Sequence, residues 1–228
     1  SVIELPEATH QRRIADLSPK AQRIYADLER DFCAQVKGGE VTASNALVKL
    51  LRLQQTTSGR VTVESDGSEP TMVKIDDAKE KGLIDLLTDV PTDEPVVVFG
   101  RFKADLASVH AAACAVGRES LELSGSRREL KEWQRGDAPI LAVQISSGGT
   151  GIDLTRAAVV CYLSTGFSLG DYEQSLARAH RPGQERAVSY YHFVARDTVD
   201  EKVYDALRQR KQVVEAILDG INTKEVSR

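Results

Sequence analysis

The sequence predicts an α/β fold in which a parallel sheet carries helices on both faces and a helical segment precedes the sheet. From Lys79 onward, short apolar segments alternate with amphipathic ones, which is the pattern of a parallel sheet covered by helices. Upstream of Lys79, apolar residues recur at helical spacing instead. The chain has 228 residues, of which 41% are hydrophobic and 28% charged. It is therefore long enough for one large α/β domain with a helical appendage.

Two helices are predicted in the first part of the chain. The first runs from Leu17 to about Lys37, and Ser18 followed by Pro19 fits an N-cap with proline at the first helical position. The second covers Ser44 to Gln54, where four residues share one face: Leu47, Leu50, Leu51 and Gln54.

A polar stretch separates these helices from the sheet. Residues 56–70 (TTSGRVTVESDGSEP) place turn residues around a short alternating segment, which predicts a small hairpin or a loop. We place the subdomain boundary here. Residues 1–75 are expected to form a helical linker or protrusion, and residues 76–228 the sheet domain with its C-terminal helix.

Five apolar segments are predicted as the strands of the sheet: Pro95–Phe99, Ser120–Ser124, Pro139–Gln144, Ala157–Leu163 and Val188–Val194. Helices are predicted between and after them, over Lys79–Leu87, Lys103–Val116, Arg127–Arg135, Leu169–His180 and Val199–Ile217.

Composition and charge exclude several classes of protein. No apolar run approaches the roughly 20 residues of a membrane helix, and the N-terminus has neither the cationic start nor the apolar core of a signal peptide. We expect a soluble intracellular protein, in bacterial or phage-infected cytoplasm or in a nucleus, with no membrane partner. The first residue, Ser1, suggests an excised piece.

Cysteine usage and net charge limit the kinds of binding site that the chain can form. Cys33, Cys114 and Cys161 are far apart in apolar contexts, so we expect no disulfide and no metal site. The net charge of −4 restricts any contact with nucleic acid to a local surface.

A glycine-rich loop follows the predicted strand that ends at Gln144. It reads ISSGGTGIDLT over residues 145–155, and its glycines would let backbone N–H groups approach a phosphate. In an open parallel sheet, ligands bind beyond the carboxyl ends of the strands, which is where this loop lies. Taken alone, the loop is equally well explained as a tight turn that needs a positive φ.

Two arginines stand near the end of the helix predicted over Leu169–His180. Arg178 and Arg181 are three residues apart and therefore project to one side, and a Pro-Gly pair then stops the helix. Guanidinium groups in this arrangement can bind anionic oxygens. The alternative is a solvated basic face, or cations that complement the negative end of the helix.

The two segments together resemble helicase motifs V and VI in their order and separation. ISSGGTGIDLT is similar to motif V, and QSLARAHRPGQ (residues 174–184) to motif VI, of the Snf-type (Swi/Snf-like) superfamily 2 translocases. VVVFGRF (residues 96–102) resembles motif IV, and Leu123–Ser126 resembles the strand end and turn of motif IVa. The resemblance covers residues 47–218 and implies the second, C-terminal RecA-like lobe of such a helicase, in a phage-like or bacterial-like member.

The resemblance implies roles for five residues at a nucleotide. Arg181 is expected to be the arginine finger and Arg178 its neighbour at the γ-phosphate, and such a finger contributes roughly 10³ to 10⁵ in rate. Gln174 would orient this helix against the site, and Gly151 and Asp153 would face the nucleotide. Many members carry Asn where this chain has Asp153, which leaves the detail of that contact open.

The resemblance also implies DNA, duplex and held through its phosphates without sequence readout, as the partner. The expected contacts are Arg101, Lys103, Ser124, Gly125, Ser146, Ser147 and Thr150. The helix predicted over Arg127–Arg135 is basic, and it either extends this DNA-binding surface or is simply a solvated face. Its basic residues are Arg127, Arg128, Lys131 and Arg135. Trp133 within that helix is more typical of a core residue than of one that stacks on a base.

The chain lacks two motifs that a motor of this class needs. It has no GxxxxGK[ST] loop to hold ATP and no acidic strand end to hold Mg²⁺. We therefore expect ATP with Mg²⁺ to be held mainly by an N-terminal RecA-like lobe of the same protein, and this chain alone to hydrolyse no ATP.

Two other functions are left open. The lobe could be a binding module for DNA or for a protein, without nucleotide chemistry, although such a scaffold has no need for two arginines on one side. An autonomous Rossmann-type enzyme is disfavoured because no GxGxxG opens a helix after the first strand.

Overall fold

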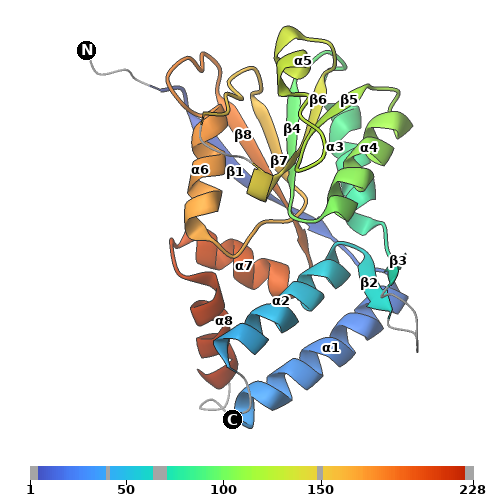
Figure 1. The fold of residues 1–228 in the computed structure, drawn as a ribbon, viewed down its shortest axis with the longest axis vertical. Helices are drawn as coiled ribbons and strands as arrows, with labels where there is room; N and C mark the ends of the chain where they lie inside the picture. The colour runs from blue at the N-terminus through green and yellow to red at the C-terminus, as the bar shows by residue number, and fades with distance from the viewer. Residues whose placement is uncertain (1–4, 40–41, 64–70, 148–150, 224–228) are drawn as a thin grey trace. The chain divides into compact units, whose positions relative to one another are not determined.

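The structure is a computed structural model that describes residues 5–39, 42–63, 71–147 and 151–223. The chain divides into two compact units. The first consists of residues 1–14 and 79–194, and the second of residues 15–78 and 195–228. Figure 1 follows the chain through both units by colour.

The first unit is built on a six-stranded sheet with the strand order β1-β8-β7-β4-β6-β5. The strands are β1 (Ala8–Ala15), β4 (Val96–Gly100), β5 (Ser120–Leu123), β6 (Ile140–Gln144), β7 (Val159–Tyr162) and β8 (Val188–Ala195). All neighbouring pairs from β8 to β5 are parallel. The predicted parallel sheet and its five predicted strands are confirmed.

The central strand β4 explains why the sheet must be covered on both faces. Every residue of its VVVFG sequence is buried, as in strands that carry helices on both sides. The strand ends at Gly100, and α4 (Lys103–Ala115) begins three residues later. A Cβ at Gly100 would lie 2.6 Å from the Cβ of Asp105, so only glycine fits here.

Helices cover the two faces of the sheet (Figure 1). On one face, α3 (Ala78–Asp89) and α4 pack Leu83, Leu87 and Val109 against strand residues that include Val96 and Ile140. On the other face lies α6 (Leu169–Ala179). Its attachment to the sheet is polar as well as apolar, because the hydroxyls of Tyr162 and Ser175 lie 2.7 Å apart and the Tyr190 hydroxyl donates to the Leu176 carbonyl at 2.8 Å.

Two short helices complete the first unit. Helix α5 (Leu130–Arg135) buries Trp133 completely, as expected for a core residue. A single 3₁₀ turn, η1 (Ile145–Ser147), follows β6 directly. It leads into residues 148–150, which lie outside the described part of the chain.

Edge strand β1 is absent from the elements predicted by sequence. It lies beside β8, where the Val188 N–H donates to the Glu7 carbonyl at 2.9 Å. Its sequence, ATHQRRIA, is mostly polar, and Gln11 and Arg12 are exposed. An edge strand tolerates such a composition because only one of its sides is paired.

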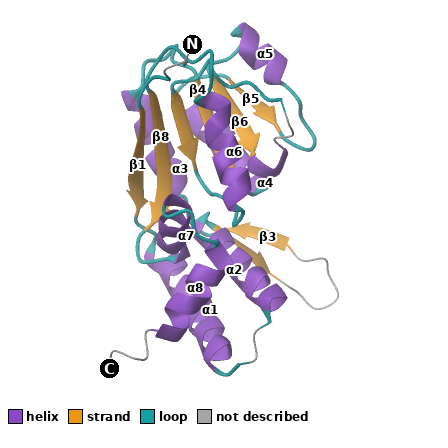
Figure 2. Ribbon diagram, turned by 90° about the vertical axis from the view of Figure 1, so that its left-hand side faces the viewer, coloured by secondary structure: helices purple, strands orange, loops and turns teal. Residues whose placement is uncertain are grey.

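The second unit contains four helices and a hairpin in its described residues: α1 (Pro19–Lys37), α2 (Ala43–Thr57), β2 (Arg60–Val63), β3 (Thr71–Lys74), α7 (Val199–Arg208) and α8 (Val213–Thr223). The two predicted N-terminal helices are confirmed, and Ser18 caps α1 as expected, with its hydroxyl accepting the Ala21 N–H. Strands β2 and β3 form an antiparallel pair, so the polar stretch contains a hairpin rather than only a loop. Figure 2 shows the four helices gathered together.

The prediction of one long helix over Val199–Ile217 is wrong. The structure has two helices, and the chain between them passes through Arg210 in the left-handed region, with a φ of 56°. The Lys211 N–H donates back to the Ala206 carbonyl at 2.8 Å, which closes the first helix. Helix α7 packs against α2, and α8 packs against both α1 and α2. Residues 195–228 therefore group with the N-terminal helices, a division that differs from the predicted domains 1–75 and 76–228.

Candidate functional site

The end of the loop after β6 and the end of α6 lie together at the amino ends of β7 and β8, because α6 runs back along the sheet from the carboxyl end of β7 to the start of β8. The Leu154 N–H donates to the Arg178 carbonyl at 3.0 Å. Buried Gln184 ties the two segments more firmly, because its Nε2 lies 3.1, 3.0 and 3.1 Å from the carbonyl oxygens of Thr155, Ala157 and Ala179. The structure thus brings together the two segments singled out by sequence. Gln184 is a functional candidate to which sequence reasoning assigned no role.

Asp153 is an exposed carboxylate beside Arg181. Its Oδ1 accepts hydrogen bonds from the Thr155 N–H at 2.9 Å and from the Thr155 hydroxyl at 2.7 Å. These bonds lower the pKa of Asp153, and the positive charge of Arg181 lowers it further. Asp153 is therefore an anion at neutral pH, and it can position Arg181 or bind a ribose hydroxyl.

Gly151 begins the described part of the glycine-rich loop after its gap. Its φ is 97° and a Cβ there would meet no atom within 4 Å. This conformation favours glycine for backbone reasons alone, so the turn explanation applies at this position whatever else the loop does. Thr150, a predicted contact, lies outside the described residues.

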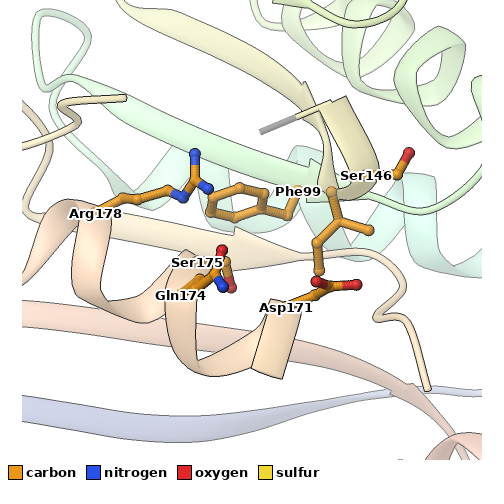
Figure 3. A pocket seen from close by; sticks show the side chains of 7 residues that line it. Phe99, Ser146, Asp171, Gln174, Ser175 and Arg178 are labelled. Atoms are coloured by element: carbon orange, nitrogen blue, oxygen red, sulfur yellow. The ribbon is translucent and has the colours of Figure 1, made fainter. Parts of the chain in front are cut away.

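Arg178 faces a pocket of about 120 Å³ at the carboxyl end of β4. The pocket is lined by Phe99, Ile145, Ser146, Asp171, Gln174, Ser175 and Arg178. Figure 3 shows the Arg178 guanidinium reaching from α6 to the Phe99 ring. Burial lowers the pKa of Arg178, which nevertheless stays charged because an arginine guanidinium is not deprotonated in proteins. Ser146, predicted as a DNA contact, shares this pocket with Gln174 and Arg178, which were predicted at the nucleotide.

Arg181 lies beyond the end of α6 and not on its last turn. The helix ends at Ala179, with His180 as its C-cap. The Arg181 carbonyl then accepts the Gln184 N–H at 2.9 Å, which forms the turn that returns Gln184 to the site. Arg181 is half-buried next to Asp153, whereas Arg178 lines the pocket.

Arg101 and Lys103 follow β4 in different environments. The Arg101 guanidinium stacks on the Phe167 ring at 4.1 Å, and burial lowers its pKa to about 10. Its backbone N–H donates to buried Asp105, which also accepts the Ser164 hydroxyl at 2.5 Å. Lys103 is exposed. Of these two predicted contacts, Lys103 is the one with a side chain fully open to an approaching phosphate.

Ser124 uses its hydroxyl inside the protein. The side chain is buried, and Oγ donates to Glu122 Oε1 at 2.5 Å while it accepts the Ser126 and Arg127 N–H groups at 3.2 Å. Glu122 in turn accepts a hydrogen bond from His110 Nε2 at 2.9 Å. Ser124 therefore shapes the turn that follows β5, and it is not free to donate to a phosphate.

The residues after Ser124 form an exposed turn, which we call the 125–128 turn. It presents Gly125, Ser126, Arg127 and Arg128 to solvent. Gly125 was a predicted contact, and a Cβ there would meet no atom within 4 Å. Ser147, another predicted contact, is half-buried, with its hydroxyl 3.4 Å from Gln144 Oε1. The structure thus favours the 125–128 turn over Ser124 and Ser147 as the surface for an anionic partner.

The Glu122→Gln substitution is expected to make the melting temperature fall less steeply as the pH is lowered. Burial raises the pKa of Glu122, but hydrogen bonds from Ser124 and His110 and the charges of His110 and Arg127 lower it more, to a net value below the ordinary 4.5. A lowered carboxyl pKa stabilises the fold above its unfolded pKa, and this contribution is lost as the pH falls through the folded pKa. The melting temperature of the unmodified protein should therefore fall more steeply between about pH 5 and pH 3 than that of Glu122→Gln. Thermal unfolding from pH 7 to pH 3 measures this, with exposed Glu215→Gln as control. Equal slopes for the two variants would contradict the expectation.

Two absences concern the described residues alone. Among these, no group of three or more His, Cys, Asp and Glu side chains could hold a metal ion. No helix in the same part of the chain is long and apolar enough to span a membrane.

Comparison with known protein families and sequences finds a matching family model and several similar proteins. The family model for the helicase conserved C-terminal domain matches residues 78–183. Protein p41 of Acyrthosiphon pisum secondary endosymbiont phage 1 is 24% identical over 227 residues, which cover 97% of this chain and 48% of the phage protein. The chromatin-remodeling ATPase INO80 of Schizosaccharomyces pombe is 29% identical over 106 residues, or 46% of this chain and 7% of INO80. The chain therefore spans about half the length of the phage relative and a small part of INO80.

Solved structures share the fold. The C-terminal part of the Fun30 ATPase domain superposes with a TM-score of 0.68 at 17% identity, covering 96% of this chain and 97% of the other. The Sulfolobus solfataricus SWI2/SNF2 ATPase core, solved in complex with dsDNA, superposes with a TM-score of 0.65 at 20% identity, covering 95% of this chain and 47% of that one. At these identities the likeness concerns the fold alone.

Proposed function

We propose that this chain is the C-terminal, RecA-like lobe of a Snf2-type superfamily 2 helicase and that it completes the ATP site of a DNA-stimulated translocase. The phosphate-binding loop and the Mg²⁺ ligands of that site belong to an N-terminal lobe of the same protein. The isolated chain then hydrolyses no ATP.

One observation carries the proposal. Arg181 lies next to the carboxylate of Asp153 where the loop after β6 meets the end of α6, and Gln184 fixes the two segments to each other through three carbonyl groups. Arg178, three residues earlier, directs its side chain into the neighbouring pocket. A solvated basic face needs no such fixation. Two guanidinium groups three residues apart, one beside Asp153 and one in the pocket, suit a ligand that carries several negative oxygens.

Each arginine has a distinct task in this proposal. Phosphoryl transfer is catalysed mainly by positioning and by electrostatic stabilisation of the charge on the transferred group. Arg181 acts as the arginine finger at the γ-phosphate, and Asp153 holds its guanidinium in place. Arg178 lies deeper, in the pocket that Gln174 and Ser146 also line, and contacts a neighbouring phosphate oxygen.

DNA is bound through its phosphates in this proposal. The Sulfolobus relative was solved with dsDNA, and the described surface offers the 125–128 turn and Lys103 as exposed donors. Backbone N–H groups and basic side chains of this kind fix the position of a duplex without reading its sequence. DNA-stimulated ATP hydrolysis by the whole protein, and its loss on substitution of Arg181, tests the proposal.

The Arg128→Ala substitution is expected to weaken DNA binding equally for unrelated sequences. Each phosphate neutralised by a side chain releases condensed counterions, so the slope of log K against log salt should become shallower by roughly 0.9 for each phosphate that is no longer neutralised. Titration of labelled duplexes of two sequences at several salt concentrations measures the slope. Arg208→Ala, at the end of α7 in the second unit, serves as the matched control and should leave the slope unchanged. An unchanged slope for Arg128→Ala would remove the 125–128 turn from the DNA-binding surface.

A further inference from the structure

Helix α5 starts at the 125–128 turn and is hydrogen-bonded to it. Glu129, the N-cap of α5, donates its N–H to the Glu122 carbonyl at 3.0 Å, and its carboxylate accepts the Glu122 N–H at 2.8 Å. The same carboxylate holds the Arg127 guanidinium through contacts of 2.8 to 3.2 Å. A movement of the Arg127 side chain therefore changes the contacts of Glu129, the N-cap of the helix.

The other end of α5 is attached to the loop after β6. Gln134 Nε2 donates to the Asp153 carbonyl at 2.9 Å. The Arg156 guanidinium donates to the carbonyls of Trp133 and Ala138, the latter at 2.9 Å, and stacks on the Trp133 ring at 4.9 Å. Because Trp133 is completely buried, these contacts fix the last turn of the helix to residues 153–156.

The connection continues to the arginines. Thr155 and Ala157 lie on either side of Arg156, and both give their carbonyls to Gln184, which also binds the carbonyl of Ala179 at the end of α6. Hydrogen-bonded contacts thus run without interruption from the exposed turn, through α5 and residues 153–157, to the segment that carries Arg181.

We propose that α5 couples DNA on the 125–128 turn to residues 153–157 and the segment that carries Arg181, with Gln134 and Arg156 as positioning residues. A phosphate at the turn competes with Glu129 for Arg127. Their ion pair is weak because the two side chains are 44% and 30% exposed. Once Arg127 binds the phosphate, its ion pair with Glu129 is lost, and the start of the helix is held less tightly to the turn. Helix α5 is short and packed around Trp133, so a shift at its start reaches Gln134 and hence Asp153.

This inference rests on the proposed function and adds a requirement to it. Coupling between two binding sites is reciprocal, so nucleotide bound at the loop must change DNA affinity by the same factor as DNA changes nucleotide affinity. The remaining polar contacts of α5 do not serve this connection. Arg135, for example, pairs with Asp137 at 3.0 Å on the exposed side.

The Gln134→Ala substitution in the whole protein tests the coupling. Gln134 is exposed, so its loss should leave the melting temperature nearly unchanged. The maximal DNA-stimulated rate of ATP hydrolysis should fall about threefold to tenfold, while the DNA concentration for half-maximal stimulation stays the same. Arg135→Ala, one residue away on the same helix, is the matched control and should change neither quantity.

A second variant, Arg156→Lys, keeps the charge but loses the planar group that reaches two carbonyls. It should lower the maximal rate in the same way, and the combined variant should lose less than the product of the two single losses because both act on one connection. The inference is overturned if Gln134→Ala behaves like Arg135→Ala, or if it raises the half-maximal DNA concentration at an unchanged maximal rate. If DNA fails to stimulate the unmodified protein, or if Arg181→Ala keeps its activity, it is the proposed function that fails.

Discussion

Arg181→Ala in the whole protein is expected to lower DNA-stimulated ATP hydrolysis by about 10³. The guanidinium stabilises negative charge that develops on the transferred phosphoryl group. Its loss therefore raises the free energy of the transition state more than that of the complex with bound ATP. The turnover number and the specificity constant should therefore fall by similar factors. Steady-state hydrolysis at saturating DNA, with ATP varied, measures both.

Two further variants sharpen this experiment. Arg181→Lys keeps a positive charge without the planar fork of five donors, so a large loss is expected for it as well. Exposed Glu185→Ala, in the same loop, should keep normal turnover. Near-normal hydrolysis by Arg181→Ala would instead support a binding module without nucleotide chemistry.

Gln184→Ala is expected to be the most destabilising single change at the site, at about 2–4 kcal/mol. Gln184 is buried, its Nε2 serves the carbonyls of Thr155, Ala157 and Ala179, and its Oε1 accepts the Arg186 N–H at 2.9 Å. Alanine leaves these groups without a partner in a space that is closed to water. For a protein of this size each kcal/mol corresponds to about 2–4 °C in melting temperature. Thermal unfolding should therefore show a fall on the order of 10 °C.

Hydrolysis should decline together with stability in this variant, because the same contacts hold Asp153 and Arg181 in place. Gln174→Ala on the exposed side of α6 is the control for unfolding, since an exposed side chain changes stability by about 0.5 kcal/mol or less. An unshifted melting curve for Gln184→Ala would show that the two segments do not depend on this residue for their attachment.

The strands of the sheet could be predicted because their sequences report burial directly. Segments such as VVVFG and VVCY are apolar without alternation, as strands covered on both faces must be. Strand β1 carries no such signal, because an edge strand with Gln11 and Arg12 in solvent resembles a loop. The break between α7 and α8 could not be predicted either, because the sequence carries no residue that is typical of a helix end there. It occurs at Arg210 in a left-handed conformation, with neither glycine nor proline beside it.

The location of the site could be predicted, but the hydrogen bonds within it could not. Helix α6 connects two neighbouring parallel strands, so its end must lie beside the residues that precede β7, and their approach to each other follows from the strand order. The partner of a hydroxyl or an amide depends on distances between segments far apart in sequence. Ser124 is an example, because Glu122 takes the hydrogen bond that a phosphate was expected to accept. Gln184 is another, because its three partners belong to two different segments.

The second unit is assembled from two stretches of chain separated by residues 79–194. On a ribosome that adds about 5–20 residues per second, α1 and α2 emerge on the order of ten seconds before α7 and α8. Until then the hydroxyl of Tyr25 lacks the Val199 N–H that it accepts at 2.6 Å, and the apolar sides of α1 and α2 lack their covering helices. The newborn chain therefore passes through a period in which these two helices are exposed to chaperones and proteases, and the exposure ends when α7 and α8 emerge and pack against them.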